Sequence, residues 1–217
     1  MVSRDKDVNV VGVDISNAVD AARKTLSGRR NLHLVQASLY DLPFRKGVFD
    51  GIYCIGVIQH TPDPLQSVRS LPKFLKTGGK LALTIYEKRK YTLLNAKYLI
   101  RPLTRRIGPK SLLGGLKVTM PVLWPITEVL FRLPVIGKAF RFVIPVANYV
   151  DDPELSWRQR YQWALMDTFD MLSPAYDQPQ TEDDVRQVLL DEGLTNIVRS
   201  PQIPGLNITA EQGHRPA

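Results

Sequence analysis

Polar side chains follow three short apolar runs in the first sixty residues of this 217-residue chain. Asp14 ends the run VVGVD, Ser38 follows NLHLVQA, and Gln59 and His60 come shortly after GVFDGIYCIG. A carboxylate at the carboxyl end of a buried strand can accept hydrogen bonds from both hydroxyls of a ribose. A histidine can act as a general base. The alternatives are that Asp14, Ser16 or Asn17 caps the helix that follows, and that His60 packs or hydrogen-bonds within a loop.

The apolar runs alternate with helical patterns, which is typical of an α/β fold with a parallel sheet and helices on both sides. We expect strands over residues 8–14, 31–37, 47–56 and 79–87, and a helix over 17–26. A second helix starts near residue 64 and ends at Gly78-Gly79. Its expected apolar face is formed by Leu65, Val68, Leu71 and Leu75.

The alternation of strand and helix patterns stops after residue 87 and resumes near the carboxyl terminus. Thr181, with Asp184 three residues later, predicts a helix start like a capping box, and Gly193 ends that helix. Two runs on either side of PQIP then predict a closing antiparallel pair. We therefore expect a sheet domain formed by residues 1–87 and 181–217, interrupted by a largely helical insert over 88–180.

Composition favours a cytoplasmic protein. The only cysteine is Cys54, so the chain can form no internal disulfide. The amino terminus lacks the apolar core of a secretion signal. No run of 18 uncharged apolar residues is present, which argues against a membrane-spanning helix.

Four segments, in order and spacing, carry a resemblance to a known family: VVGVDIS, QASLYDLPF, FDGIYCIGVIQHTPDP and LKTGGKLALTIYE. They resemble class I S-adenosylmethionine-dependent methyltransferases, and among them the group that contains ubiquinone and menaquinone biosynthesis methyltransferases. The resemblance covers residues 8–87 and, more loosely, 181–217. It implies a Rossmann-like three-layer sheet with an antiparallel last strand, and S-adenosylmethionine as the cofactor. No metal site is expected.

The resemblance also implies roles for six residues at the strand ends. Asp14 would bind the ribose hydroxyls and Ile15 would lie against the adenine. Ser38 and Leu39 would meet the adenine edge, while Cys54 and Ile55 would line the methionine portion through their backbone. The family usually has an aspartate at the position of Ser38, and nearby Asp41 is the carboxylate that could substitute for it.

In this family a first strand and its Gly-x-Gly loop precede the strand that ends in the ribose-binding acid. Here only thirteen residues precede Asp14, and Gly12 is the single glycine among them. We expect either that the chain is truncated at its amino terminus, which we favour, or that the two flanking strands have closed up. The missing loop would impair cofactor binding and activity.

The insert concentrates the positive charge of the chain. Between Lys88 and Arg141 there are twelve Lys or Arg residues and one acid, Glu128, a balance of +11, whereas the remaining 17 bases and 20 acids give −3. Residues 91–107 predict an amphipathic helix kinked at Pro102, with Leu93, Ala96, Leu99, Ile100, Leu103 and Ile107 opposite Lys97, Arg101 and Arg105.

Two interpretations of the insert stay open. It is a lid whose apolar face is core, or a lid that also contacts an anionic membrane surface, for which Trp124 and the interleaved bases are suited. A nucleic-acid surface is the weakest choice, because the segment lacks a basic–aromatic platform.

The expected reaction is methyl transfer to a small, apolar or lipid-linked acceptor. Candidate substrate contacts are Gln59, Tyr86, Tyr161, Asp167, Asp170 and Tyr176, and His60 is the candidate base. One rival is a catalytically inactive, membrane-associated binding protein. A second rival, a nicotinamide-dependent reductase, is disfavoured because no Tyr-x-x-x-Lys pair follows the fourth strand.

Overall fold

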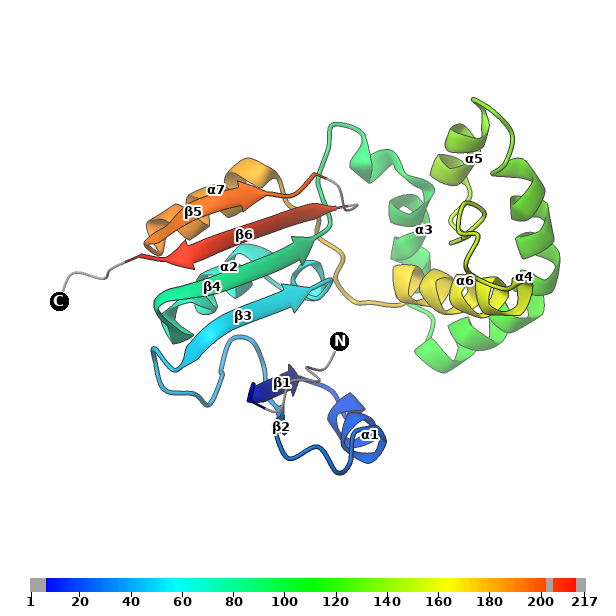
Figure 1. The fold of residues 1–217 in the computed structure, drawn as a ribbon. Helices are drawn as coiled ribbons and strands as arrows, with labels where there is room; N and C mark the ends of the chain where they lie inside the picture. Colours follow the sequence, from blue (N-terminus) through cyan, green and yellow to red (C-terminus); the bar gives the residue numbers. More distant parts are fainter. Residues whose placement is uncertain (1–6, 202–204, 214–217) are drawn as a thin grey trace. The chain divides into compact units, whose positions relative to one another are not determined.

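The structure is a computed structural model that describes residues 7–201 and 205–213. The chain divides into two compact units, a sheet unit (Met1–Tyr86 with Gln180–Ala217) and a helical unit (Glu87–Pro179) (Figure 1). Both division points fall one residue before the boundaries expected from the sequence.

The sheet unit contains a four-stranded sheet in the order β3-β4-β6-β5. Strands β3 (Phe49–Ile55) and β4 (Leu75–Ile85) are parallel. Strand β6 (Leu206–Gln212) runs antiparallel to both β4 and β5 (Leu194–Arg199). The expected antiparallel closing pair is confirmed, although residues 202–204 of the intervening PQIP lie outside the described residues.

Strands β1 (Val10–Asp14) and β2 (Leu32–Gln36) form a separate parallel pair, joined by helix α1 (Ala18–Thr25). Among the described strands, neither β1 nor β2 is hydrogen-bonded to β3. The strands on either side of the expected gap have therefore not closed up, and within the described ranges β1 pairs only with β2 and β3 only with β4 (Figure 1).

One face of the four-stranded sheet holds the core. Helix α2 (Pro64–Ser70) contributes Val68 and helix α7 (Glu182–Asp191) contributes Leu189 to the same buried cluster as Leu81 and Leu83 of β4. On the opposite face Tyr53 and other β3 side chains are exposed, because side chains alternate along a strand. The N-cap of α7 is as expected, since the Asp184 amide donates to the Thr181 hydroxyl.

The helix expected after residue 64 ends earlier than the sequence pattern predicts. Pro72 has no amide hydrogen to continue α2, and a 3₁₀ turn, η2 (Pro72–Phe74), follows instead. Leu75 then begins β4 rather than completing a helical face, so that expectation was wrong. Asp63 caps α2 by accepting from the Gln66 amide, and a 3₁₀ turn, η1 (Ile58–His60), lies between β3 and α2.

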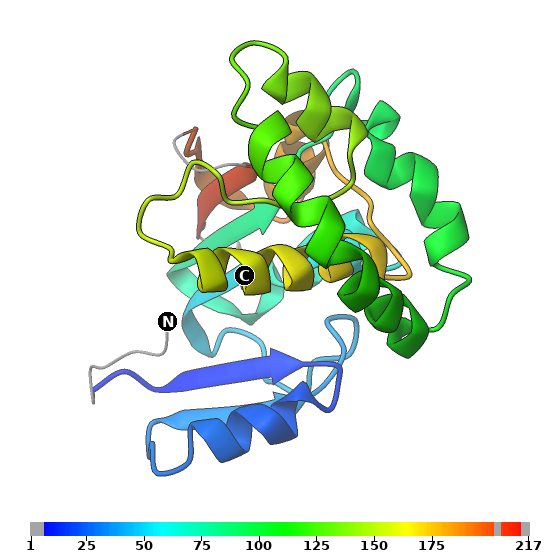
Figure 2. The ribbon, with the colours of Figure 1, turned by 90° about the vertical axis from the view of Figure 1, so that its right-hand side faces the viewer.

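The helical unit comprises η3 (Thr92–Leu94), α3 (Ala96–Thr104), α4 (Pro109–Leu130), α5 (Gly137–Val143) and α6 (Trp157–Leu172). Helices α4 and α6 pack together (Figures 1 and 2), and their core is formed mainly by Leu112, Leu116, Met120, Trp124, Ala164 and Leu172. A search of the described helices found none with the length and apolar content needed to cross a membrane.

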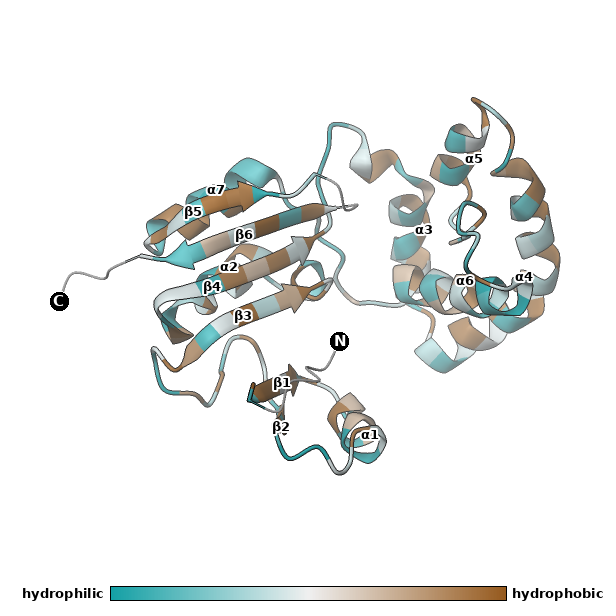
Figure 3. Ribbon diagram, viewed as in Figure 1, coloured by the Kyte–Doolittle hydropathy of each residue, from teal (hydrophilic) through white to brown (hydrophobic). Residues whose placement is uncertain are grey.

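Helix α3 buries its polar side and exposes leucines, the reverse of a simple amphipathic helix that packs on a core. Its polar side points inward: Arg101, 5% exposed, donates to the carbonyls of Met171 and Pro174 at 2.9 and 2.8 Å. Leu99 and Leu103 are 68% and 62% exposed. Of the two open interpretations, an apolar face that is simply core does not fit α3, because Leu99 and Leu103 are exposed, although Ile100 packs against the core of the unit. Figure 3 shows that hydrophobic residues also extend over much of α4.

Candidate cofactor site

Asp14 lies at the carboxyl end of β1, opposite Gln36 of β2. Its Oδ1 accepts hydrogen bonds from the Ser16 amide at 2.8 Å and the Ser16 hydroxyl at 2.7 Å. The Ser16 hydroxyl in turn accepts from the Ala18 amide at the start of α1. The capping alternative therefore holds in part: the Ser16 hydroxyl accepts from the first turn of α1, while Asn17 makes no side-chain capping bond, and Asp14 supports this turn through one carboxylate oxygen. Within the described residues the other oxygen, Oδ2, has no hydrogen bond and remains available for a ribose.

The loop after β2 is tied to the end of β1. The Ala37 amide donates to the Asp14 carbonyl at 3.1 Å, and the Gln36 side chain donates to the Ile15 carbonyl at 3.1 Å. These bonds bring Ser38 next to the turn that carries Asp14, while the Ile15 side chain is exposed. The proximity expected for a ribose contact and an adenine contact is present.

Ser38 is partly occupied by its own loop. Its hydroxyl accepts from the Tyr40 amide at 3.2 Å, and it forms an isolated bridge with Asp41. Leu39 packs against the sheet core, and the Tyr40 hydroxyl donates to the Asp63 carbonyl at 2.9 Å. The loop is thereby fixed against the turn before α2. Asp41 is exposed beside Ser38, where a carboxylate could accept from an adenine amino group.

Cys54 and Ile55 end β3. The Cys54 side chain is buried in the core, and burial raises the pKa of its thiol to about 11. The thiol is therefore protonated at neutral pH and unsuited to nucleophilic chemistry. Gly56 follows with a φ of +68°, a conformation that favours glycine, and its amide donates to the Thr84 carbonyl at 2.9 Å. A role for this segment through its backbone agrees with these positions.

Gln59 is fully buried in η1, and neither atom of its side-chain amide has a hydrogen-bond partner. A Cβ at Gly56 would lie 3.9 Å from the Gln59 amide nitrogen, so the two residues are neighbours. Buried amides are normally paired because an unsatisfied one costs about 1–3 kcal/mol. Gln59 is thus the most unusual polar group at this end of the sheet.

His60 packs against Tyr86 in an edge-to-face arrangement, with ring centroids 5.6 Å apart. Its backbone amide donates to the Val57 carbonyl at 2.9 Å, closing η1. This is the packing role that competed with the general-base interpretation. Tyr86 retains an exposed part of its ring, so both residues remain candidates for acceptor contacts.

The other four candidate substrate residues belong to the helical unit. Tyr161 packs edge-to-face on Trp124. Asp167 accepts from the Tyr149 hydroxyl, and its pKa is raised by burial and then by the neighbouring charge of Asp170. The contacts of Tyr161, Asp167, Asp170 and Tyr176 with an acceptor stay predictions.

Asp177 is a structural residue whose role the sequence did not reveal. Its carboxylate is fully buried and accepts from Lys97 at 3.0 Å and from the Tyr98 hydroxyl at 3.3 Å. Burial lowers the pKa of Lys97, and the carboxylate of Asp177 opposes that shift. The row of bases Lys97, Arg101 and Arg105 is the sequence feature that could have indicated an acid partner inside the unit.

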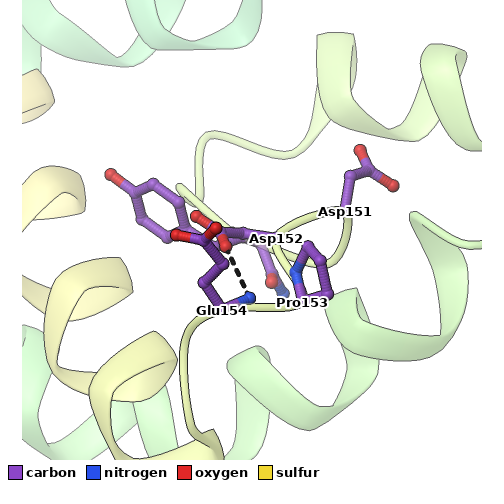
Figure 4. A pocket seen from close by; sticks show the side chains of 6 residues that line it. Asp151, Asp152, Pro153 and Glu154 are labelled. Carbon is purple, nitrogen blue, oxygen red and sulfur yellow. Dashed lines mark hydrogen bonds between the residues drawn. The ribbon is translucent and has the colours of Figure 1, made fainter.

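Two surface hollows among the described residues include none of the predicted cofactor residues in their lining. One is lined by Asn148, Tyr149, Asp151, Asp152, Pro153 and Glu154 (Figure 4). There the Glu154 amide donates to Asp152 at 3.0 Å, and Asp151 pairs with Arg141 at 2.6 Å. The other lies along α1. Over the described residues no cluster of three His, Cys, Asp or Glu side chains suits a metal ion.

Comparison with known proteins finds similarity to methyltransferases in the first part of the chain. Residues 2–83 match the family model described as a methyltransferase domain. Over 78 residues the chain is 32% identical to a tRNA U34 carboxymethyltransferase of Psychromonas ingrahamii, covering 34% of this chain and 24% of the relative. Over 63 residues it is 33% identical to a ubiquinone biosynthesis O-methyltransferase of Xanthomonas oryzae pv. oryzae, covering 27% of this chain and 26% of the relative.

A crystal structure of SAM-dependent methyltransferases from Methanosarcina mazei aligns with 95% of this chain and 83% of that chain, with a TM-score of 0.50 and 15% identity. At this identity the likeness concerns the fold. The matched segment spans only 19% to 24% of the length of three curated relatives. A match to so small a part of each relative does not establish the activity of that relative for this chain.

Proposed function

We propose that this chain, a member of the class I S-adenosylmethionine-dependent methyltransferases, transfers a methyl group from that cofactor to a small apolar or lipid-linked acceptor. The assignment of the cofactor is supported mainly by the proximity of the carboxyl ends of β1 and β2. Asp14 presents a carboxylate oxygen without a partner, next to the loop that holds Ser38.

The residues present fit an adenosyl group on its ribose side. Oδ2 of Asp14 can accept from the ribose hydroxyls, and the exposed side chain of Ile15 can cover an adenine face. Ser38 is a weaker hydrogen-bond acceptor than the usual aspartate, and we propose that the Asp41 carboxylate also accepts from the adenine amino group. When bound, the cofactor supplies a methyl group activated by a sulfonium. The chain contributes binding and alignment, which are the main requirements of a displacement reaction.

The acceptor is proposed from the character of the helical unit. Its exposed leucines on α3 and its surplus of bases suit a substrate delivered from, or attached to, a lipid surface. We propose a cytoplasmic protein that acts at the inner face of a membrane. His60, Gln59 and Tyr86 are the proposed acceptor contacts of the sheet unit, and Tyr161, Asp167, Asp170 and Tyr176 those of the helical unit.

Isothermal titration of the full chain with S-adenosylmethionine tests the cofactor site. We expect Asp14→Ala to weaken binding by about 1–3 kcal/mol, because ribose hydroxyls lose a charged acceptor. Asp14→Asn should lose less. The matched control is Ser16→Ala, which removes the hydroxyl hydrogen bond to Asp14 but leaves the amide hydrogen bond and the carboxylate, and should bind nearly as well as the parent. Equal weakening by Ser16→Ala would reduce Asp14 to a turn residue.

One observation favours a second function, binding without turnover. In the part of the chain that the structure describes, one edge of β1 and one edge of β3 have no paired strand, so the sheet is interrupted beside the predicted site. A total lipid extract incubated with the chain and methyl-labelled cofactor distinguishes the two. Label in the organic phase supports methyl transfer. Cofactor binding without label in any fraction supports the inactive, membrane-associated alternative.

A further inference from the structure

We propose that the helical unit binds the surface of an anionic bilayer through an exposed patch at α3 and the segment that follows it. The patch is formed by Leu99 and Leu103 of α3, Arg106 and Ile107 of the next turn, and Lys110 at the start of α4. This deepens the proposed function by naming the surface from which a lipid-linked acceptor would be reached. The biological use of this binding rests on the proposed function, but the binding itself does not, since attachment to lipid requires no methyl transfer.

The direction of this face is fixed by contacts within the helical unit. Arg101 and Thr104 both face inward, where the Thr104 hydroxyl donates to the Leu172 carbonyl at 3.0 Å. Lys97 is held by buried Asp177. The inner side of α3 is therefore anchored by polar bonds. The opposite side must be the one with Leu99 and Leu103, which lie one helical turn apart.

The helical unit also carries exposed bases that no carboxylate neutralises. Seven exposed bases between residues 88 and 141 have no carboxylate within ion-pair distance among the described residues: Lys88, Lys90, Arg105, Arg106, Lys110, Lys117 and Lys138. The single acid of that segment, Glu128, is buried against Arg160 and adds almost nothing to the surface. Exposed leucines beside unpaired bases are what an interfacial helix presents to anionic lipid.

A nucleic acid would match the charge but not the leucines. Single-stranded nucleic acid needs aromatic platforms for its bases, and no aromatic residue lies on the α3 face, where the exposed side chains are aliphatic. An anionic bilayer can bind both the exposed leucines, in its apolar interior, and the bases, at its charged surface.

Sedimentation of the full chain with vesicles tests the inference. We expect pelleting with phosphatidylcholine–phosphatidylglycerol vesicles and little with phosphatidylcholine alone. Binding should fall about tenfold or more between 0.1 M and 1 M salt, because the Debye length shrinks from about 10 Å to about 3 Å. The double variants L99S/L103S and R106Q/K110Q should each weaken binding about tenfold without lowering the melting temperature, because these side chains are exposed.

The matched control is V118S/V122S, which removes two equally exposed apolar side chains from the outer side of α4. It should bind anionic vesicles like the parent. Equal pelleting with neutral vesicles, no pelleting with either, or an equal loss in V118S/V122S would overturn the assignment to α3. Tight binding to single-stranded RNA without vesicle binding would overturn it in favour of nucleic acid. Titration with S-adenosylmethionine, run in parallel, reports the cofactor site separately.

Discussion

At the scale of single residues, two glutamines share an unusual environment and differ in their position. Gln59 and Gln212 are 0% and 3% exposed, and neither side-chain amide has a hydrogen-bond partner. Gln59 follows the carboxyl end of β3, beside the predicted site. Gln212 ends β6, next to Gly193 and away from that end of the parallel strands. An unpaired buried amide at a site is explained if a ligand supplies its partner.

This contrast gives a prediction about Gln59→Met. The substitution keeps the length of the side chain and removes a costly unpaired amide, so the free energy of unfolding should rise by about 1 kcal/mol. The stabilisation that cofactor or acceptor adds should shrink. Thermal melting with and without S-adenosylmethionine, and with lipid extract, measures both effects.

Gln212→Met serves as the control for Gln59→Met. It should raise stability in the same way and leave the ligand-dependent shift unchanged. A lower melting temperature in Gln59→Met would mean that its amide has an internal partner. An unchanged ligand-dependent shift would remove Gln59 from the site.

The candidate site could be predicted in part because strand ends are readable from sequence. Asp14 and Ser38 follow apolar runs of strand length, and the structure brings their backbones together. The environment of Gln59 was not readable. Its burial depends on a 3₁₀ turn, η1, that contacts α2, and no periodic sequence pattern predicts such a turn. The packing of His60 on Tyr86 likewise joins residues 26 positions apart, beyond the reach of local spacing.

At the scale of elements, α4 and α6 are joined by a buried ion pair between Glu128 and Arg160. Arg132, one turn after Glu128, lies 2.7 Å from the second carboxylate oxygen. We predict that Glu128→Ala lowers the free energy of unfolding by about 3 kcal/mol or more, because it leaves a buried guanidinium without its partner. Denaturant unfolding measures the loss.

Two variants control for the cause of that loss. Arg132→Ala should cost under about 1 kcal/mol, since Arg132 is half exposed. The double variant Glu128→Leu/Arg160→Met should recover most of the stability lost in Glu128→Ala, because it leaves no unpaired charge. A double variant as unstable as the single would show that packing, rather than the buried charge, determines the cost.

A second element-scale prediction concerns pH and the start of α7. Hydrogen bonds from Arg199 at 2.7 Å and Arg186 at 3.1 Å lower the pKa of the Glu182 carboxyl. A depressed pKa means that stability is present above the unfolded-state value, near 4.3, and is lost as pH falls through the folded-state value. Glu182→Gln should therefore be less stable than the parent at pH 7, by under about 1 kcal/mol, since the pair is partly exposed.

The pH dependence separates this effect from a loss of packing. Parent and Glu182→Gln should converge in melting temperature as the pH is lowered below about 4. Glu182 also lies in the first turn of α7, where a negative charge is favourable. A difference that persists unchanged in acid would assign the loss to side-chain shape rather than to charge.

At the scale of the whole molecule, alternation of strands and helices was enough to predict the α/β class, the insert and the antiparallel closing pair. Periodicity failed where a single residue overrode it, as at Pro72, which ended α2 and returned Leu75 to a strand. It also could not assign the direction of α3. A helical pattern separates two faces, but only the carbonyls and the buried acid in the rest of the unit determine which face turns inward.

The separate pairing of β1 with β2 has a consequence for how the cofactor site responds to a ligand. These strands share no hydrogen-bonded ladder with the four-stranded sheet. The segment from β1 to β2 can therefore open without breaking the larger core, and its amide protons should exchange with solvent sooner than those of β4 and β6. Because Asp14 and Ser38 lie at its end, an adenosyl ligand would slow that exchange, so that part of the binding free energy goes into ordering the site that receives it.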